Sequence, residues 1–167
     1  HLDDRDALRA LPEGSLGRAY LQFVEREAIS AGGLIEASER DLEFVDADFE
    51  RFANRMRDQH DLWHVLTGYG RDTFGEACLL AFTYAQTNNR GIAFIALAGM
   101  FKLSRAIGGS VRSAMWQAYR AGKRANWLPA EDWECRLEQP LETVREELGI
   151  TPPERYREVL EALPAAA

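Results

Sequence analysis

The chain has 167 residues, of which 46% are hydrophobic and 28% are charged, and its net charge is −7. These values are typical of a globular chain that can bury a core, and they argue against a disordered one. The acidic balance argues against nucleic acid as a main partner, because phosphate binding requires a basic face. We expect one domain over residues 1–167, with residues 1–10 and 163–167 frayed.

Two features of the composition bear on the compartment. The two cysteines, Cys78 and Cys135, make no disulfide framework, and we interpret them as free core thiols in a reducing compartment. No signal-peptide pattern opens the chain, and no apolar run reaches the ~18 residues that a bilayer-spanning helix needs. The best candidate, residues 91–101, predicts a buried helix or one that meets lipid.

The first half of the chain predicts short helices separated by turns. Ser15 follows a turn-rich stretch and is expected to cap a helix over about residues 16–29, which a glycine pair ends. Residues 36–57 carry many charges between isolated apolar positions. They predict two short helices with a break near Asp46 and a solvated face.

The middle of the chain predicts a helix, a glycine turn and a second helix. The first helix covers about residues 59–67 and stops at Gly68, where glycine allows a left-handed turn. The second begins near Asp72 or Thr73, both good caps, and ends at about residues 88–91.

The remaining elements are also helical. An apolar helix is expected over residues 92–107, and Ser110 is expected to cap the next one. A helix over 140–148 follows, and Thr151 and Glu154 have the spacing of a capping box before a last helix. Since no segment reads convincingly as a strand, the pattern predicts an all-α fold, a bundle of about seven to eight helices.

Two of the three histidines, His60 and His64, lie four residues apart, with Asp61 between them. A helix turns by about 100° per residue, so the three side chains project within one sector of roughly 100°. Two imidazoles at this spacing can reach one metal ion. Glu76 lies beyond the glycine turn, and a helix–turn–helix hairpin would return its carboxylate to them. Two nitrogens and two oxygens suit zinc, our first choice, and also iron(II), manganese or cobalt.

Other readings of this motif remain open. The histidines could be structural and the carboxylates surface charges. A zincin protease fits poorly, because its pattern has Glu where this chain has Asp61, and a third internal histidine is missing. The missing histidine also weakens an HD-type phosphohydrolase, and an unrelated metal hydrolase would need a polar pocket and a general base. Asp58, Tyr69 and Arg71 are close enough in sequence to support the ligands.

The string His60-Asp61-x-x-His64, then eleven residues, then Glu76 resembles the signature of the ubiquinone (coenzyme Q) biosynthesis family called Coq-four. Further segments also match the family. They are residues 11–17, HDLWHVLTGY over residues 60–69, Gly75-Glu76, residues 80–82, Trp133-Glu134, and the stretches within 140–150. The resemblance covers about residues 11–150 and fits a bacterial-type member without an organelle-targeting segment.

The resemblance implies an all-helical protein in which His60, Asp61, His64 and Glu76 hold one divalent metal and form the catalytic site. It implies a metal-dependent oxidative decarboxylase that replaces the C1 carboxylate of a polyprenylated hydroxybenzoate precursor by a hydroxyl. The alternative is a non-catalytic, lipid-binding scaffold for other ubiquinone biosynthesis proteins, with a structural metal. We expect a cytoplasmic homodimer attached peripherally to the inner membrane of a bacterium.

The family's groove for a polyprenyl tail directs attention to residues 91–124. Phe94, Leu97, Ala98 and Phe101 share one helix face and could line such a groove, although ordinary core packing would give the same pattern. A local basic patch could meet an anionic headgroup or form a solvated face. It consists of Arg112, Arg120, Lys123 and Arg124.

Overall fold

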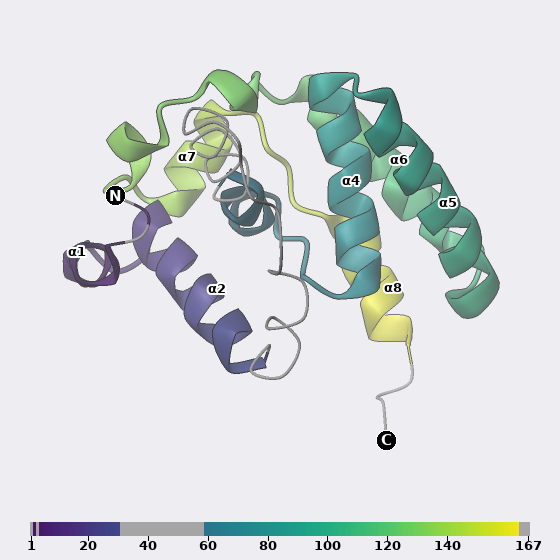
Figure 1. Cartoon of the computed structure of the whole chain (residues 1–167), viewed down its shortest axis with the longest axis horizontal. Helices are drawn as coiled ribbons and strands as arrows, with labels where there is room; N and C mark the ends of the chain where they lie inside the picture. Colours follow the sequence, from purple (N-terminus) through teal and green to yellow (C-terminus); the bar gives the residue numbers. More distant parts are fainter. Residues whose placement is uncertain (1, 3, 31–58, 164–167) are drawn as a thin grey trace, which may run out of the picture. The chain divides into compact units, whose positions relative to one another are not determined.

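The computed structural model describes residues 2, 4–30 and 59–163, and these residues form an all-helical fold (Figure 1). The part described contains no regular strand, only an isolated antiparallel bridge between Ser15 and Pro140. The predicted fold class is therefore confirmed. The two short helices predicted within 36–57 lie outside the described residues.

The chain divides into two compact units. The first comprises His1–Val65 with Asp132–Val144, and the second comprises Leu66–Glu131 with Arg145–Ala167. The division falls inside a helical segment over residues 59–67. A single domain over residues 1–167 stays a prediction.

The first unit opens with a helix that the sequence does not predict, α1 (Arg5–Ala10). The Asp4 side chain caps it by accepting a hydrogen bond from the Ala7 amide at 3.0 Å, and Leu8 is buried. The expectation that residues 1–10 fray differs from the structure here, because one cap and one buried leucine suffice to hold a short helix.

Helix α2 (Leu16–Ser30) begins as predicted. The Ser15 hydroxyl accepts a hydrogen bond from the Arg18 amide at 3.3 Å, so Ser15 is confirmed as the cap. The Leu16 amide donates to the carbonyl of Gln139 at 2.9 Å, which ties this helix start to the segment between the short turn η3 (Trp133–Arg136) and α7 (Leu141–Glu147).

The helical segment 59–67 stops at Gly68, whose φ of +74° is in the left-handed region. Glycine adopts this conformation without the steric penalty that a Cβ brings, so the predicted turn is confirmed. The Arg145 guanidinium donates through Nε to the Leu66 carbonyl at 2.8 Å and satisfies one acceptor of this helix end.

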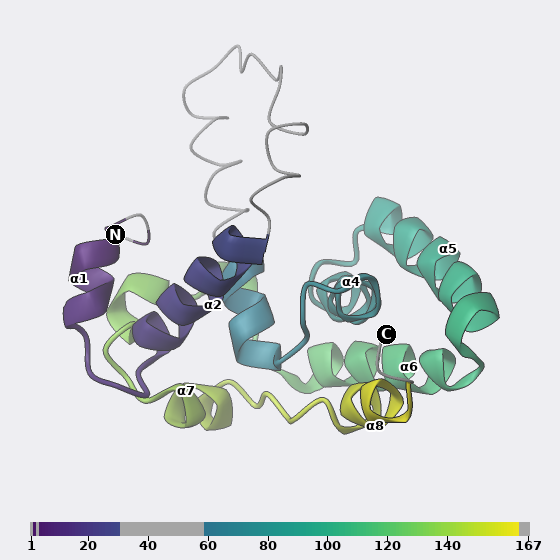
Figure 2. The ribbon, with the colours of Figure 1, turned by 90° about the horizontal axis from the view of Figure 1, so that it is seen from below.

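The second unit is built around α4 (Thr73–Thr87). Helix α4 packs against both α5 (Arg90–Ile107) and α6 (Ser110–Arg124), and α6 also packs against α8 (Glu154–Ala162). Figure 2 looks along α4 and shows α5 and α6 on different sides of it. A short turn, η2 (Leu128–Ala130), follows α6.

Buried polar groups join α4 to α6. The Gln86 side chain is buried, donates through Nε2 to the Gly122 carbonyl at 2.6 Å and accepts from the Leu128 amide at 2.9 Å. A Cβ at Gly122 would lie 2.6 Å from the Phe82 carbonyl oxygen, so the two backbones meet where a side chain is absent. This crossing fixes α6 beside α4.

Side-chain caps start two helices of this unit, α4 and α5. Asp72 accepts from the amides of Phe74 and Gly75, each at 3.0 Å, which confirms it as the α4 cap. Asn89 caps α5 in the same way, after the left-handed Asn88 ends α4. The prediction for Ser110 is wrong, because α6 already includes this residue and starts without a side-chain cap.

The capping box predicted at Thr151 is also wrong. Helix α8 begins at Glu154 directly after Pro153, and no side chain caps it. A proline disfavours the helical conformation of the residue before it, so Pro153 keeps Pro152 out of the helix. Glu154 is therefore the first helical residue and cannot serve as the third.

Helix α5 presents apolar side chains to solvent. Its only buried residue among those described is Ala96, while Phe94 is 73% exposed. Ile95, Leu97 and Phe101 are also at least half exposed. The reading of this helix as ordinary core is therefore wrong. No helix in the described ranges has the length and hydropathy that a bilayer crossing requires.

The two cysteines differ in their surroundings. Cys78 on α4 is buried, as predicted, whereas Cys135 is exposed. The prediction of a core thiol is wrong for Cys135, which sits in the η3 turn and donates to Asp132 Oδ2 at 3.3 Å. Both thiols are free.

Candidate metal centre

The two histidines of segment 59–67 lie side by side. Their ring centroids are 4.7 Å apart in an edge-on arrangement, as expected for positions one helical turn apart. His64 is buried, and the Phe23 ring of α2 stacks on it with the centroids 5.5 Å apart. The Asp61 carboxylate lies 3.8 Å from His60 Nδ1. The shared face predicted for His60, Asp61 and His64 is consistent with these contacts.

Glu76 lies in the first turn of α4, and the glycines before it shape the backbone there. A Cβ on Gly75 would fall inside the contact distance of the Gly70 carbonyl oxygen, so only glycine lets the turn lie this close to α4. Arg71 Nε is 3.9 Å from Glu76 Oε1, at the margin of an ion pair.

Tyr156 of α8 holds this turn from a distance in sequence. Its hydroxyl donates to Asp72 Oδ2 at 2.5 Å and accepts from the Gly70 amide at 3.0 Å. Burial, and then the bond to Asp72, raise the pKa of the Tyr156 hydroxyl, so it stays a donor at neutral pH. Because Asp72 also caps α4, Tyr156 supports the start of the helix that carries Glu76. Tyr156 was not predicted from the sequence, because no local signal marks it.

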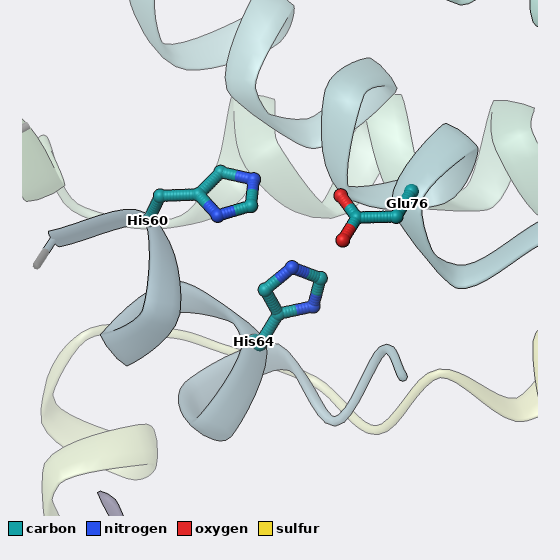
Figure 3. A group of neighbouring side chains, drawn as sticks. All are labelled: His60, His64 and Glu76. Atoms are coloured by element: carbon teal, nitrogen blue, oxygen red, sulfur yellow. The ribbon is translucent and has the colours of Figure 1, made fainter. Parts of the chain in front are cut away.

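His60, His64 and Glu76 each offer one ligand atom, and these atoms all lie within 4.8 Å of one another (Figure 3). In a tetrahedral zinc site, bonds of about 2.0–2.2 Å place neighbouring ligand atoms roughly 3.4 Å apart. The spacing of these three ligand atoms is therefore of the order that one shared metal ion requires. Two imidazoles and a carboxylate fit a divalent metal, so the residues suit the predicted group. Asp61 is not within this group, although it borders His60.

The residues predicted to support the ligands have different outcomes. Asp58 lies outside the described residues. Tyr69 is buried, which raises the pKa of its hydroxyl, and its ring meets Tyr156 edge-on with centroids 5.4 Å apart. Arg71 contacts one of the candidate ligands, Glu76.

The residues predicted to bind lipid distribute over several surfaces of the second unit. A groove of about 490 Å³ opens between α4, α5 and α6, and its lining includes Leu97 and Arg112. The lining does not include Phe94, Ala98 or Phe101, which are exposed on α5.

Several apolar residues that line this groove were not predicted from the sequence. Their positions on α4 and α6 have helical spacing, but the spacing alone does not reveal which face meets α5. They are Ala81, Tyr84, Met115 and Tyr119.

The four basic residues do not form one patch around this groove. Arg112 lines the groove, whereas Arg120 and Arg124 line a second pocket between α6 and α8. Lys123 lines neither, and its Nζ lies 3.4 Å from Asn88 Oδ1.

Comparison with known families identifies the group to which the histidine motif belongs. Residues 2–154 match the family model described as coenzyme Q (ubiquinone) biosynthesis protein Coq4. The chain belongs to the Coq4 family. The expected resemblance is thus confirmed, and the match extends on both sides of the motif.

Two curated Coq4 relatives show the extent of the similarity. The mitochondrial ubiquinone biosynthesis protein COQ4 homologs of Bos taurus and Homo sapiens are 34% and 33% identical to this chain, each over 90% of it. The chain spans about half the length of these relatives, 56% of each.

A solved structure shares the Coq4 fold of this chain. A protein from Nostoc punctiforme PCC 73102 that is named for ubiquinone biosynthesis has 27% sequence identity and a TM-score of 0.68. The match covers 87% of this chain and 67% of that one.

Proposed function

We propose that this chain acts in ubiquinone biosynthesis by replacing the C1 carboxylate of a polyprenylated hydroxybenzoate precursor with a hydroxyl. The observation that carries the proposal is the group of His60, His64 and Glu76, whose ligand atoms lie within 4.8 Å in a Coq4 family member. The same donor set would suit a hydrolase, but the groove of about 490 Å³ between α4, α5 and α6 is lined mostly by apolar residues.

The proposed roles follow from the surroundings of each side chain. His60, His64 and Glu76 hold one divalent metal, zinc or else iron(II), manganese or cobalt, and Asp61 joins them as a fourth ligand from beside His60. When bound, the metal supplies a Lewis acid for a phenolate or carboxylate oxygen. Phe23 fixes the ring plane of His64 by stacking on it.

The proposed reaction is an oxidation, so an assay of it must include an oxidant. The substrate and one water molecule together give the hydroxylated ring and CO2. This conversion releases two electrons and two protons. An oxidant must therefore accept the electrons, and we propose dioxygen, which takes up the two electrons and two protons and becomes hydrogen peroxide. Zinc carries no redox chemistry, so metal identity decides whether the metal can share in electron transfer.

The proposed substrate tail lies in the groove between α4, α5 and α6. The groove volume of about 490 Å³ is within the range of small-molecule sites, roughly 300–1,000 Å³. Leu97, Met100 and Met115 offer apolar contacts there, and methionine adapts to chains of different shape. This groove therefore does not require one particular length of the substrate tail.

A direct assay tests the decarboxylase proposal. Purified protein with bound metal, dioxygen and a short-tail hydroxybenzoate substrate should give CO2 and the hydroxylated product in equal amounts. His64→Gln should lower both metal content and product at least tenfold, because it removes one ligand. Cys135→Ser, an exposed change away from the motif, should keep both. Equal product from wild type and His64→Gln would exclude metal chemistry.

A second candidate is a lipid-binding scaffold with a structural metal, and the exposed apolar face of α5 favours it. In that case chelation should lower the melting temperature, while no protein preparation makes product. Lipid that copurifies with the wild type should then remain bound to His64→Gln. Loss of lipid together with metal would contradict the scaffold.

The exposed apolar residues also motivate the proposed location and assembly. Phe94, Ile95 and Phe101 could enter the surface of the inner bacterial membrane, or pair with the same face of a second copy or with other ubiquinone biosynthesis proteins. Flotation with vesicles and the mass in solution distinguish these outcomes. Phe94→Ser with Phe101→Ser should reduce vesicle binding if α5 meets lipid, and should convert dimer to monomer if it meets a copy.

A further inference from the structure

A second pocket, distinct in chemistry from the apolar groove, lies between α6 and α8. Its volume is about 350 Å³, and its lining is largely polar. The lining residues are Ser113, Trp116, Gln117, Arg120, Ala121, Arg124, Thr151 and Arg155. A pocket of this size accommodates a small polar group rather than a long chain.

The α6 side of this pocket is one helical face. Ser113, Gln117, Arg120 and Arg124 follow one another at intervals of four, three and four residues, which places them along a single stripe. The pocket side of α6 therefore carries two guanidinium groups one turn apart.

The α8 side supplies a third guanidinium and is anchored to α6. The Arg155 amide donates to Gln117 Oε1 at 2.9 Å, so the first turn of α8 is held against the stripe. The Arg155 side chain pairs with Glu158 at 2.8 Å. Neither Arg120 nor Arg124 has a carboxylate partner within the ranges that the structure describes.

The pocket carries an excess of positive charge, although the protein as a whole is negatively charged. Three arginines and the one carboxylate that pairs with Arg155 leave two positive charges, in a protein whose net charge is −7. A guanidinium group can donate two parallel hydrogen bonds to two oxygens of one phosphate, and it remains charged at all physiological pH values. A phosphate monoester near neutral pH carries a charge between −1.5 and −2, which complements this excess.

We propose that the pocket formed by Arg120, Arg124 and Arg155 binds a phosphate group. The Gln117 amide and the Thr151 hydroxyl offer further hydrogen bonds from the two sides of the pocket. This site uses none of the candidate metal ligands and does not depend on the decarboxylase proposal.

Two sources of phosphate fit this chemistry, and Trp116 separates them. The Trp116 side chain lines both this pocket and the apolar groove between α4, α5 and α6. A lipid phosphate could therefore lay its tail in the groove, past Trp116, with its head at the arginines. Free phosphate or a short phosphomonoester would use the arginine pocket alone.

Calorimetric titration of the full chain with inorganic phosphate and with monomeric dodecyl phosphate tests the site. Saturable binding is expected for at least one of these probes, and Arg124→Gln should weaken it on the order of tenfold, as expected for loss of a charge-assisted contact. Arg105→Gln is the matched control, because Arg105 is an exposed arginine of α5 that lines neither pocket.

The two probes separate the sources of the phosphate. Dodecyl phosphate that binds at least tenfold tighter than inorganic phosphate, with the gain lost in Leu97→Ser, indicates a lipid headgroup. Equal affinities indicate a free phosphate or a short ester. Absence of saturable binding to both probes overturns the proposal, and so does an equal loss in Arg124→Gln and Arg105→Gln. Circular dichroism and the melting temperature confirm that each variant is folded.

Discussion

At the scale of single residues, the turn before Glu76 depends on one distant hydroxyl. Tyr156 joins the Gly70 amide and the Asp72 carboxylate, and Asp72 in turn caps α4. A residue more than eighty positions downstream of this turn therefore helps to set the backbone that presents a candidate metal ligand. Its ring is also packed, edge-on, against Tyr69.

Tyr156→Phe removes the hydroxyl and keeps the ring. We expect the free energy of unfolding to fall by about 1–3 kcal/mol, because the two part-buried hydrogen bonds to the Gly70 amide and the Asp72 carboxylate are lost. Tyr84→Phe is the matched control, since the Tyr84 hydroxyl makes no hydrogen bond among the described residues and should change stability by under ~0.5 kcal/mol. Urea unfolding of both variants measures the difference, and equal losses would contradict the role of Tyr156.

The buried Cys78 thiol gives stability a pH dependence. Burial, and then the nearby charge of Asp72, raise the pKa of this thiol in the folded chain, whereas the unfolded thiol titrates near ~8.5. Above that pH only the unfolded chain releases the proton, so the stabilising contribution is complete below ~8.5 and is lost as the pH rises.

We expect the free energy of unfolding to fall from pH 8 to pH 10, and to fall less in Cys78→Ala. The thiol can contribute at most about 1.4 kcal/mol per pH unit. Urea unfolding at several pH values measures both slopes. Parallel slopes for wild type and variant would show that Cys78 does not titrate differently in the two states.

At the scale of helices, the α4–α6 crossing requires a residue without a side chain. Gly122→Ala places a Cβ 2.6 Å from the Phe82 carbonyl oxygen and 2.9 Å from the Ala85 Cβ. We expect a loss of about 1–3 kcal/mol, because backbone must shift to admit the methyl group. Gly99→Ala is the control within α5, where the nearest atom would be 3.9 Å away.

The control should be neutral or more stable by up to ~1 kcal/mol, since alanine favours a helix over glycine. Thermal unfolding followed by circular dichroism at 222 nm compares the two variants. A Gly122→Ala protein as stable as Gly99→Ala would show that the helices adjust without cost.

How far the sequence predicts these helices depends on whether the signal is local. Ser15, Asp72 and Gly68 act within a few residues of their own positions, and each was predicted correctly. Thr151 carries the correct spacing for a cap, but the two prolines after it move the helix start to Glu154. The capping-box spacing and the restriction imposed by proline predict different helix starts, and the restriction by proline decides where the helix begins.

Long-range features were predicted least well. His60 and His64 share a face because of helical geometry, which the sequence contains, and Glu76 was assigned through the turn and the family motif. The support by Tyr156 and the burial of Cys78 but not Cys135 depend on which faces meet after folding. Apolar spacing likewise does not reveal that α5 leaves its apolar side chains uncovered.

At the scale of the whole molecule, the candidate metal should couple to stability. A ligand that binds only the folded chain adds about 2.7 kcal/mol when it is present at a hundred times its dissociation constant. Removal of the metal with a chelator should therefore lower the melting temperature by several degrees, and zinc should restore it.

His64→Gln provides the control for this coupling. Its melting temperature should not respond to the chelator or to added zinc, whereas that of Cys135→Ser should respond as the wild type does. Differential scanning calorimetry measures these shifts. An equal response of His64→Gln would place the stabilising metal elsewhere.

The uncovered side chains of α5 also govern the solubility of the protein. Sulfate ions are excluded from protein surfaces and strengthen the association of apolar groups. A chain that exposes Phe94, Ile95 and Phe101 together should therefore salt out at low ammonium sulfate and bind strongly to a phenyl column. A mild detergent that covers this face would keep the protein in solution at concentrations suited to crystallisation.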